Sequence, residues 1–178
     1  MTTLIYDVVY AVYFILPAYF ANAFPVIFGG GRPIDGGRTL SDGKPLFGPN
    51  KTVRGFLAGL ITGTIVSFIL NAAFQYELLL GFMLSLGALT GDLLHSFIKR
   101  RIGIPAGSPL PVADQLDFVL GALLFSLFVP HSQPPLYPLP TPLPSFLTTA
   151  IIVVIITPPI HLLTNFLAYL LGVKKTPW

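Results

Sequence analysis

The sequence predicts an all-α integral membrane protein with about five transmembrane helices, and three observations support this prediction. Of the 178 residues, 53% are hydrophobic and only 10% are charged, whereas a soluble domain carries about 25% charged residues. Five stretches approach the roughly 20 apolar residues that a spanning helix needs. All ten Lys and Arg residues lie outside these stretches. The absence of cysteine excludes disulfides and thiolate metal sites.

The first expected span, residues 8–28, lies near the start of the chain. Its Ala21-Asn22-Ala23 segment has the small-x-small pattern of a signal-peptidase site. A signal peptide also needs basic residues before its apolar run, and none precedes this one. We therefore expect a retained helix, bent at Pro17.

The other expected spans follow in order. The second, 55–74, has no charged residue, and the third, 78–98, contains one carboxylate, Asp92. The fourth, 112–129, has two carboxylates near its start. The fifth, 146–171, is interrupted by a proline pair, which predicts a kink whose freed carbonyls are satisfied by neighbouring helices or water. Together the five spans form one domain that covers the whole chain.

The basic residues predict the orientation in the membrane. They lie in the loop 29–54, in the loop 99–111 and in the tail after the fifth span, and five crossings place these three segments on one side. The N-terminus, the turn 75–77 and the proline-rich connector 131–145 share the other side and contain no Lys or Arg. The positive-inside rule then puts the N-terminus outside and the C-terminus in the cytoplasm. Four or six spans would split the basic residues between the two faces.

A polar stripe runs along the end of the third span. At about 100° per residue, Asp92, His95, Ser96 and Lys99 share one helix face. A carboxylate inside a span costs about 2.5–3.5 kcal/mol on insertion scales, so Asp92 should face a partner or a water-filled cavity. The alternative is a structural clasp, between Asp92 and either Lys99 or His95, that only holds helices together.

A pair of carboxylates begins the fourth span. Asp114 and Asp117 lie three residues apart on one helix face, where two like charges repel unless a cation lies between them. With Asp92 from the neighbouring span, they form an oxygen-rich set near one membrane face, which suits Mg²⁺ shared with substrate phosphates. The alternative for this pair is the ordinary preference of acidic residues for a helix N-terminus.

A phosphate-binding segment is expected just before the second span. Asn50, Lys51, Thr52 and Arg54 lead into a helix N-terminus, where backbone N–H groups bind anions readily. The spacing of a Walker loop is missing. The basic residues there could instead contact anionic lipids or set the topology, as we expect for Lys174 and Lys175. Carboxylates and cations at one membrane face together suit a metal-bound polyphosphate and metal-assisted displacement at phosphorus.

The motifs resemble a known family. The run from Ser96 to Arg100, the later Pro111 and the run from Asp114 to Asp117 are similar to the signature of the CDP-diacylglycerol synthases. Pro49-Asn50-Lys51-Thr52 resembles their Pro-x-Lys-Thr segment. The short chain and the Gly-Pro-Asn-Lys-Thr-x-Arg-Gly form are more similar to the archaeal branch, the CDP-archaeol synthases. The chain lacks the His-Gly-Gly of bacterial members and has Gln115 where they have Arg, which favours the shorter archaeal type.

The resemblance implies transfer of CMP from CTP to a phosphorylated isoprenoid ether lipid in the bilayer, 2,3-bis-(geranylgeranyl)-glycerol 1-phosphate, with release of pyrophosphate. It implies no nucleic-acid partner. Asp92, Asp114 and Asp117 would hold Mg²⁺ at the cytoplasmic face and, with Lys99, form the catalytic set. The lipid phosphate is already anionic, so no strong general base is needed and His95 is optional. The phosphate-binding residues would be Asn50, Lys51, Thr52, Arg54, Ser96, Arg100 and Arg101.

Two other functions remain open from the sequence. A CDP-alcohol phosphotransferase also uses aspartates at a cytoplasmic mouth, although its Asp-x-x-Asp-Gly-x-x-Ala-Arg run is absent here. An ion or phosphate transporter could use Asp92 as an intramembrane ion site. The nearly uncharged outer face argues against a path for ions through the membrane.

Overall fold

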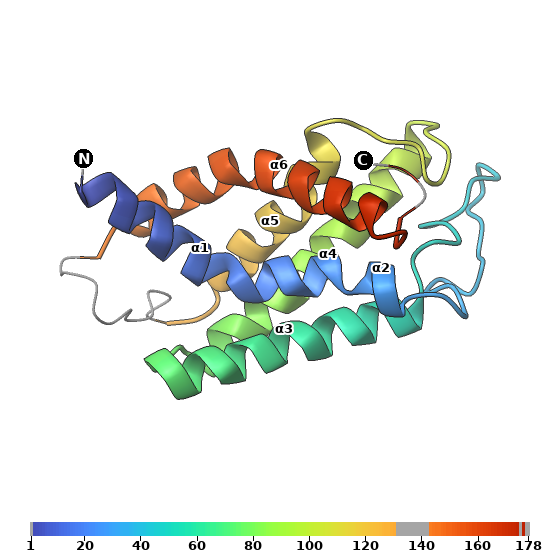
Figure 1. Cartoon of the computed structure of the whole chain (residues 1–178). Helices are drawn as coiled ribbons and strands as arrows, with labels where there is room; N and C mark the ends of the chain where they lie inside the picture. The colour runs from blue at the N-terminus through green and yellow to red at the C-terminus, as the bar shows by residue number, and fades with distance from the viewer. Residues whose placement is uncertain (1, 131–142, 175, 177–178) are drawn as a thin grey trace.

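A computed structural model describes residues 2–130, 143–174 and 176, and this part of the chain is entirely helical apart from loops and two isolated β-bridges (Figure 1). The all-α prediction is therefore confirmed. The helices are α1 (Thr2–Ala23), α2 (Pro25–Phe28), α3 (Val53–Phe74), α4 (Leu78–Arg101), α5 (Ala113–Ser126) and α6 (Phe146–Leu170).

Four segments are long and apolar enough to cross a membrane: Leu4–Phe28, Val53–Phe74, Leu78–Arg101 and Phe146–Leu170. The helix α5 has 14 residues and, at about 1.5 Å per residue, is about 21 Å long. That length is less than the roughly 30 Å of a bilayer's hydrocarbon core. Four full spans and a shorter fifth helix thus make up the membrane part of the protein.

The basic segments gather at one end of the helix bundle (Figure 1). The loop before α3, the loop between α4 and α5, and the segment after α6 lie at this end. The start of α1 and the turn between α3 and α4 lie at the opposite end. Most of the expected proline-rich connector, residues 131–142, lies outside the described residues, as does Lys175. The arrangement agrees with the one-sided charge pattern, while the membrane side of each end stays a prediction.

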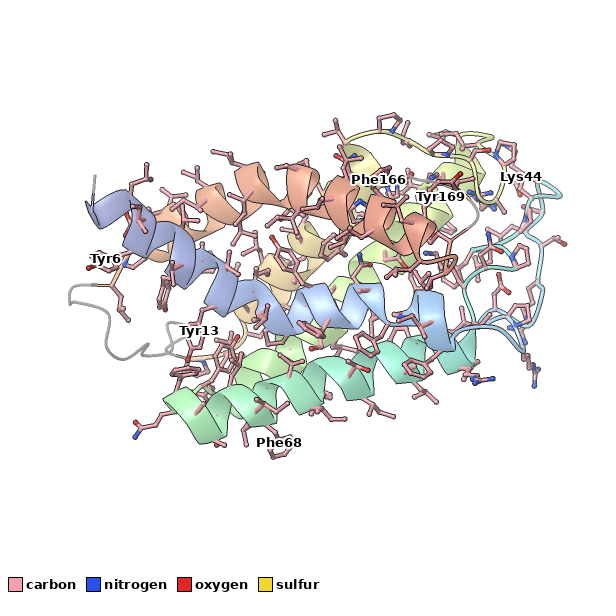
Figure 2. The ribbon with its side chains drawn as sticks, viewed as in Figure 1. Tyr6, Tyr13, Lys44, Phe68, Phe166 and Tyr169 are labelled. Carbon is pink, nitrogen blue, oxygen red and sulfur yellow. The ribbon has the colours of Figure 1, made fainter. Side chains whose placement is uncertain are left out.

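The outward faces of the helices are apolar, as a lipid environment requires. On α3, Ile61, Ile65 and Phe68 are 52–57% exposed, and Figure 2 shows Phe68 pointing away from the bundle. Inside, Tyr76 is fully buried and its hydroxyl donates a 2.7 Å hydrogen bond to the carbonyl oxygen of Phe14. This bond ties the turn after α3 to α1, at the end opposite the basic segments.

The helices α4 and α5 approach closely because glycines line their contact. A Cβ atom added at Gly121 would lie 2.8 Å from the Cα atom of Gly91 and would also collide with the carbonyl oxygen of Gly87. A Cβ atom at Gly91 would lie 3.1 Å from the Cα atom of Gly121. Small residues allow such backbone contact between membrane helices. This contact brings Asp92, which follows Gly91, beside the helix that carries Asp117.

Gly121→Ala is expected to destabilise the protein. An alanine stabilises an exposed helix by up to about 1 kcal/mol relative to glycine, but overpacking a tight contact costs about 1–3 kcal/mol, so the clash should dominate. Thermal unfolding in detergent should show a lower midpoint. Leu120→Ala is the matched control, because Leu120 is 55% exposed on the outer face of the same helix. A Gly121→Ala midpoint at or above that of the unmodified protein would show that the contact between α4 and α5 accommodates an added methyl group.

Candidate active site

The carboxylate of Asp92 on α4 is bound by the segment that precedes α3. Lys51 Nζ lies 2.6 Å from both carboxylate oxygens of Asp92. The loop itself fixes Lys51, whose carbonyl oxygen accepts a 2.8 Å hydrogen bond from the Ile34 N–H. Thr52 begins the helix, and its hydroxyl accepts a 3.1 Å bond from the Gly55 N–H as a helix cap. The predicted phosphate-binding segment and the polar stripe on α4 are therefore in direct contact.

The carboxylate of Asp114 is held by three groups. Lys99 Nζ lies 2.7 and 2.9 Å from its two oxygens, and His95 Nε2 lies 2.7 Å from Oδ1. The Leu110 N–H donates a 2.6 Å bond to Oδ2. Lys99 also donates to the carbonyl oxygen of Ser108 at 2.7 Å. Because Lys99 is only 7% exposed, this network anchors the loop between α4 and α5 onto α4.

The turn into α5 is strained just before the first of its two carboxylates. Val112 has φ +66° and ψ −50°, a region that a β-branched residue rarely adopts. The Ala113 N–H donates a 2.8 Å bond across it to the carbonyl oxygen of Pro111, which forms a γ-turn. Such backbone strain costs about 1–3 kcal/mol and occurs most often at functional sites. Here the turn directs Asp114 back towards Lys99 and His95.

A possible metal-binding group forms where α4 and α5 meet. Ligand atoms of His95, Asp114 and Asp117 all lie within 4.8 Å of one another. The structure thus brings together two of the three carboxylates that the sequence indicated, while the third, Asp92, pairs with Lys51. His95, which sequence reasoning left optional, belongs to the group. In the sequence, His95 lies on the same polar stripe as Asp92 and Lys99, and this position could have indicated that it belongs to the site.

The oxygen donors of this region fit a hard divalent cation. Asp117 is half-buried and, among the described residues, makes no ion pair. The negative charges of Asp92 and Asp114 both act on it. A carboxylate in this position is stabilised by an added cation, and Mg²⁺ prefers oxygen ligands to the imidazole nitrogen of His95.

Arg100 is a buried residue that makes no ion pair in the described part of the chain, although the charge of Asp114 attracts it. It is 6% exposed, its Nε atom has no hydrogen-bond partner, and within the described ranges its guanidinium makes no ion pair. Burying an uncompensated charge is strongly unfavourable. The guanidinium is planar and suited to two-point binding of phosphate. Arg100 thus fits an anionic ligand on the α4 side of the site.

The other predicted phosphate-binding residues are placed differently. Arg101 binds the first loop, because its Nη1 atom lies 2.9 and 3.0 Å from the carboxylate oxygens of Asp42. It also donates to the carbonyl oxygens of Lys44 and Pro45. Ser96 is buried on α4. Asn50 and Arg54 are exposed beside the start of α3.

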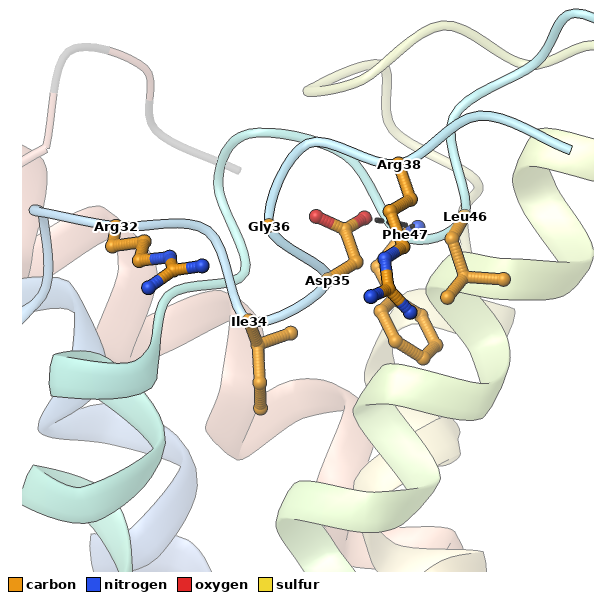
Figure 3. A pocket seen from close by; sticks show the side chains of 7 residues that line it. All are labelled: Arg32, Ile34, Asp35, Gly36, Arg38, Leu46 and Phe47. Atoms are coloured by element: carbon orange, nitrogen blue, oxygen red, sulfur yellow. Dashed lines mark hydrogen bonds between the residues drawn. The ribbon is translucent and has the colours of Figure 1, made fainter.

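The first loop lines an open pocket of about 390 Å³ that sequence reasoning missed (Figure 3). Arg32 and Arg38 line it, together with Ile34, Leu46 and Phe47 around the buried Asp35. Burial favours a raised pKa for Asp35, but the N–H groups of Phe47, Gly37 and Gly48 bond to its carboxylate and lower the pKa below its usual value. Asp35 therefore organises the loop, and the two arginines supply positive charge to the pocket.

Comparison with known proteins identifies the family. The family model described as CarS-like, CDP-archaeol synthase, matches residues 1–178. The CDP-archaeol synthase of Methanococcoides burtonii is 43% identical over 183 residues, covering 92% of this chain and 99% of that protein. The CDP-archaeol synthase of Thermococcus gammatolerans is 46% identical over 176 residues, covering 95% of each chain.

A solved structure of an intramembrane enzyme for archaeal membrane lipids biosynthesis has the same fold. It superposes with a TM-score of 0.73 at 38% identity, covering 87% of this chain and 92% of that chain. The matches in sequence and in structure extend over nearly the full length of both partners. The chain therefore belongs to the CDP-archaeol synthase family.

Proposed function

We propose that this protein transfers CMP from CTP to 2,3-bis-(geranylgeranyl)-glycerol 1-phosphate, forming unsaturated CDP-archaeol and pyrophosphate in archaeal phospholipid synthesis. Membership of the CDP-archaeol synthase family supports an enzyme of the CTP-dependent cytidylyltransferase class. The observation that carries the site assignment is that Arg100 and Asp117, which have opposite charges, make no ion pair among the described residues. A metal-bound polyphosphate satisfies both charges at once.

The reaction is a displacement at the α-phosphorus of CTP. An oxygen of the lipid phosphate forms a bond to the α-phosphorus, while the bond from that phosphorus to the oxygen bridging the α- and β-phosphates breaks. Pyrophosphate leaves with the electron pair of the broken bond. The attacking phosphate is already an anion, so no side chain needs to remove a proton. Positioning and charge stabilisation then supply most of the catalysis.

The residues of this chain divide that work. Arg100 would bind phosphate oxygens. The carboxylate of Asp92 fixes the ammonium group of Lys51, and the carboxylate of Asp114 fixes that of Lys99. His95 orients Asp114 rather than acting as a base. Asp92, Asp114 and Asp117 would hold Mg²⁺, which when bound neutralises the negative charge of the polyphosphate.

We place this site on the cytoplasmic side, where CTP is available. The support is the positive-inside rule together with the common position of the basic segments at one end of the bundle (Figure 1). The N-terminus would then be outside and the C-terminus in the cytoplasm.

The direct test is pyrophosphate release from CTP by the purified protein in detergent. Release should require both Mg²⁺ and the phosphorylated isoprenoid lipid, and the unphosphorylated lipid alcohol should not replace it. CMP release from a CDP-alcohol substrate, with no turnover of CTP, would favour the phosphotransferase alternative. Folded protein that releases no pyrophosphate with lipid and Mg²⁺ would overturn the proposal.

A further inference from the structure

The half of α6 that follows Pro158 and Pro159 has a polar face turned inward and an apolar face turned outward. His161, Asn165 and Ala168 are half-buried on one face at helical spacing. Apart from Thr164 and Tyr169, the exposed residues of the same half are large aliphatic or aromatic side chains, at 47–62% exposure: Leu162, Leu163, Phe166, Leu167 and Leu170. Polar groups inside a membrane span normally face a partner or a water-filled cavity. The inward face of this half-helix is therefore built to meet something polar.

The inward polar pair lies on the side of α6 that packs against α5, next to Asp117. The amide nitrogen of Asn165 lies 3.2 Å from Nδ1 of His161. The His161 ring lies 6.0 Å from the ring of Phe118, the residue after Asp117. The charges of Lys174, Asp114 and Asp92 act on His161. Lys174 follows α6 and is half-buried, so the tail that seemed to serve orientation alone adds a cation here.

The hydrogen bonding of this pair leaves a donor available. An amide N–H of Asn165 donates, so Nδ1 of His161 accepts and we assign the ring proton to Nε2. This Nε2–H has no hydrogen-bond partner within the described part of the chain. The second amide hydrogen of Asn165 is a further donor. Such a set suits an anion with several acceptor oxygens.

We infer that His161 and Asn165 form the subsite for the phosphate of the lipid acceptor, an inference that rests on the proposed function. The packing of α6 favours the lipid over the nucleotide as its ligand. This helix contacts α1 and α5, and its buried residues, Thr149, Val153 and Thr157, all precede the proline pair.

After the proline pair, the half-helix has an apolar face on the outside and a half-buried face whose His161 ring packs against Phe118 of α5, beside Asp117. A phosphorylated lipid has an apolar part and a polar part in the same way. Its chains stay in the bilayer, while its phosphate must reach the carboxylates of Asp114 and Asp117. In Figure 2, Phe166 and Tyr169 lie on this half of α6, at the end of the bundle that carries Lys44. The nucleotide, by contrast, arrives from water, past the loops at that end.

The test separates acceptor binding from turnover. Equilibrium binding of radiolabelled 2,3-bis-(geranylgeranyl)-glycerol 1-phosphate to the full-length protein is measured without CTP, with the unphosphorylated lipid alcohol as comparison. His161→Ala should weaken binding of the phosphorylated lipid about tenfold or more, the loss expected for a hydrogen bond to a charged group. Binding of the alcohol should not change. In turnover assays the KM for the lipid should rise while the KM for CTP stays constant.

Two further variants distinguish phosphate binding from helix packing. Asn165→Asp keeps the shape of the side chain but adds a negative charge, so it should weaken phosphate-lipid binding more than Asn165→Ala does. A packing role predicts the opposite order, because aspartate preserves the packing better. Thr164→Val is the matched control, since Thr164 is exposed in the same turn and bonds only to carbonyl oxygens of its own helix. Its lipid binding should equal that of the unmodified protein.

Several results would overturn the inference. These are unchanged lipid binding in His161→Ala, the reverse order of the two Asn165 variants, or a rise in the KM for CTP alone, which would assign the pair to the nucleotide. Each leaves the proposed function intact if the unmodified protein still forms pyrophosphate. Conversely, unmodified protein that binds the phosphorylated lipid through His161 but never turns over CTP would contradict the proposed function and retain this subsite.

Discussion

Asp117→Asn is expected to reduce kcat by about 100- to 1,000-fold, the scale seen when a group that stabilises transition-state charge is removed. Asp117 is half-buried and makes no ion pair in the described structure; the charges of Asp92 and Asp114 repel it, while that of Lys51 attracts it. A neutral amide removes the ligand charge that Mg²⁺ requires. It also removes the repulsion, so the thermal midpoint of the variant without substrate should stay constant or rise. Turnover of CTP and thermal unfolding in detergent measure the two effects.

The control for this variant is Glu77→Gln. Glu77 is an exposed carboxylate at the start of α4, at the opposite end of the bundle, and its loss should leave kcat unchanged. Near-normal activity of Asp117→Asn would remove Asp117 from the metal site. A folded, inactive variant with a clearly lower midpoint would instead assign Asp117 a structural role.

Arg100→Met is expected to inactivate the enzyme while stabilising the protein. The guanidinium of this buried residue makes no ion pair among the described residues. Replacing a buried charged group by an apolar side chain of similar length can stabilise a protein by about 1–4 kcal/mol. The same change removes the phosphate-binding group, so we expect turnover to fall by about 100-fold or more. Opposite signs for stability and activity are typical of a residue that is placed for its ligand at the expense of the fold.

Arg101→Met provides a contrast at the next position. Arg101 binds Asp42 and the carbonyl oxygens of Lys44 and Pro45, so its loss should lower the thermal midpoint by detaching the first loop. Thermal unfolding and turnover of both variants are compared side by side. If Arg100→Met were also destabilised, Arg100 would have a structural partner and its assignment to phosphate would fail.

Much of the fold could be predicted from the sequence because bilayer thickness and the positions of charges constrain helices strongly. The apolar run around Asp92 predicted a helix to residue 98, and α4 continues to Arg101. The fourth span was expected over residues 112–129, and α5 is shorter at both ends. Its start is set by the strained turn at Val112, which no propensity indicates because valine disfavours positive φ.

The pairing of charges could not be predicted in the same way. Sequence spacing suggested a clasp between Asp92 and Lys99 or His95, and this alternative is wrong. Asp92 pairs with Lys51, 41 residues earlier, and Lys99 and His95 both bind Asp114. These partners depend on the packing of α4 against α5 and on the folding of the first loop. Local periodicity in the sequence does not reveal tertiary contacts of this kind.

Several residues were missed in the sequence for one reason. Their neighbours in the folded protein draw attention to them, whereas their spacing along the sequence does not. His161 and Asn165 are polar residues in an apolar run, and only the packing of α6 shows that both are half-buried and that His161 lies against Phe118 of α5. In the sequence, Arg32 and Arg38 cannot be distinguished from ordinary topology signals. Only the folded loop shows that they line a pocket around Asp35. The family resemblance, by contrast, was confirmed because it depended on ordered motifs that are local in the sequence.

The central claim, transfer of CMP to a lipid phosphate, is tested most directly by following the label from CTP. The purified protein is given Mg²⁺, the phosphorylated isoprenoid lipid and CTP labelled at either the α- or the γ-phosphorus. The proposed displacement predicts that label from the α-position appears in the lipid fraction and label from the γ-position appears only in pyrophosphate. Label from the γ-position in the lipid, or α-label that stays in water-soluble products, would contradict the proposed reaction.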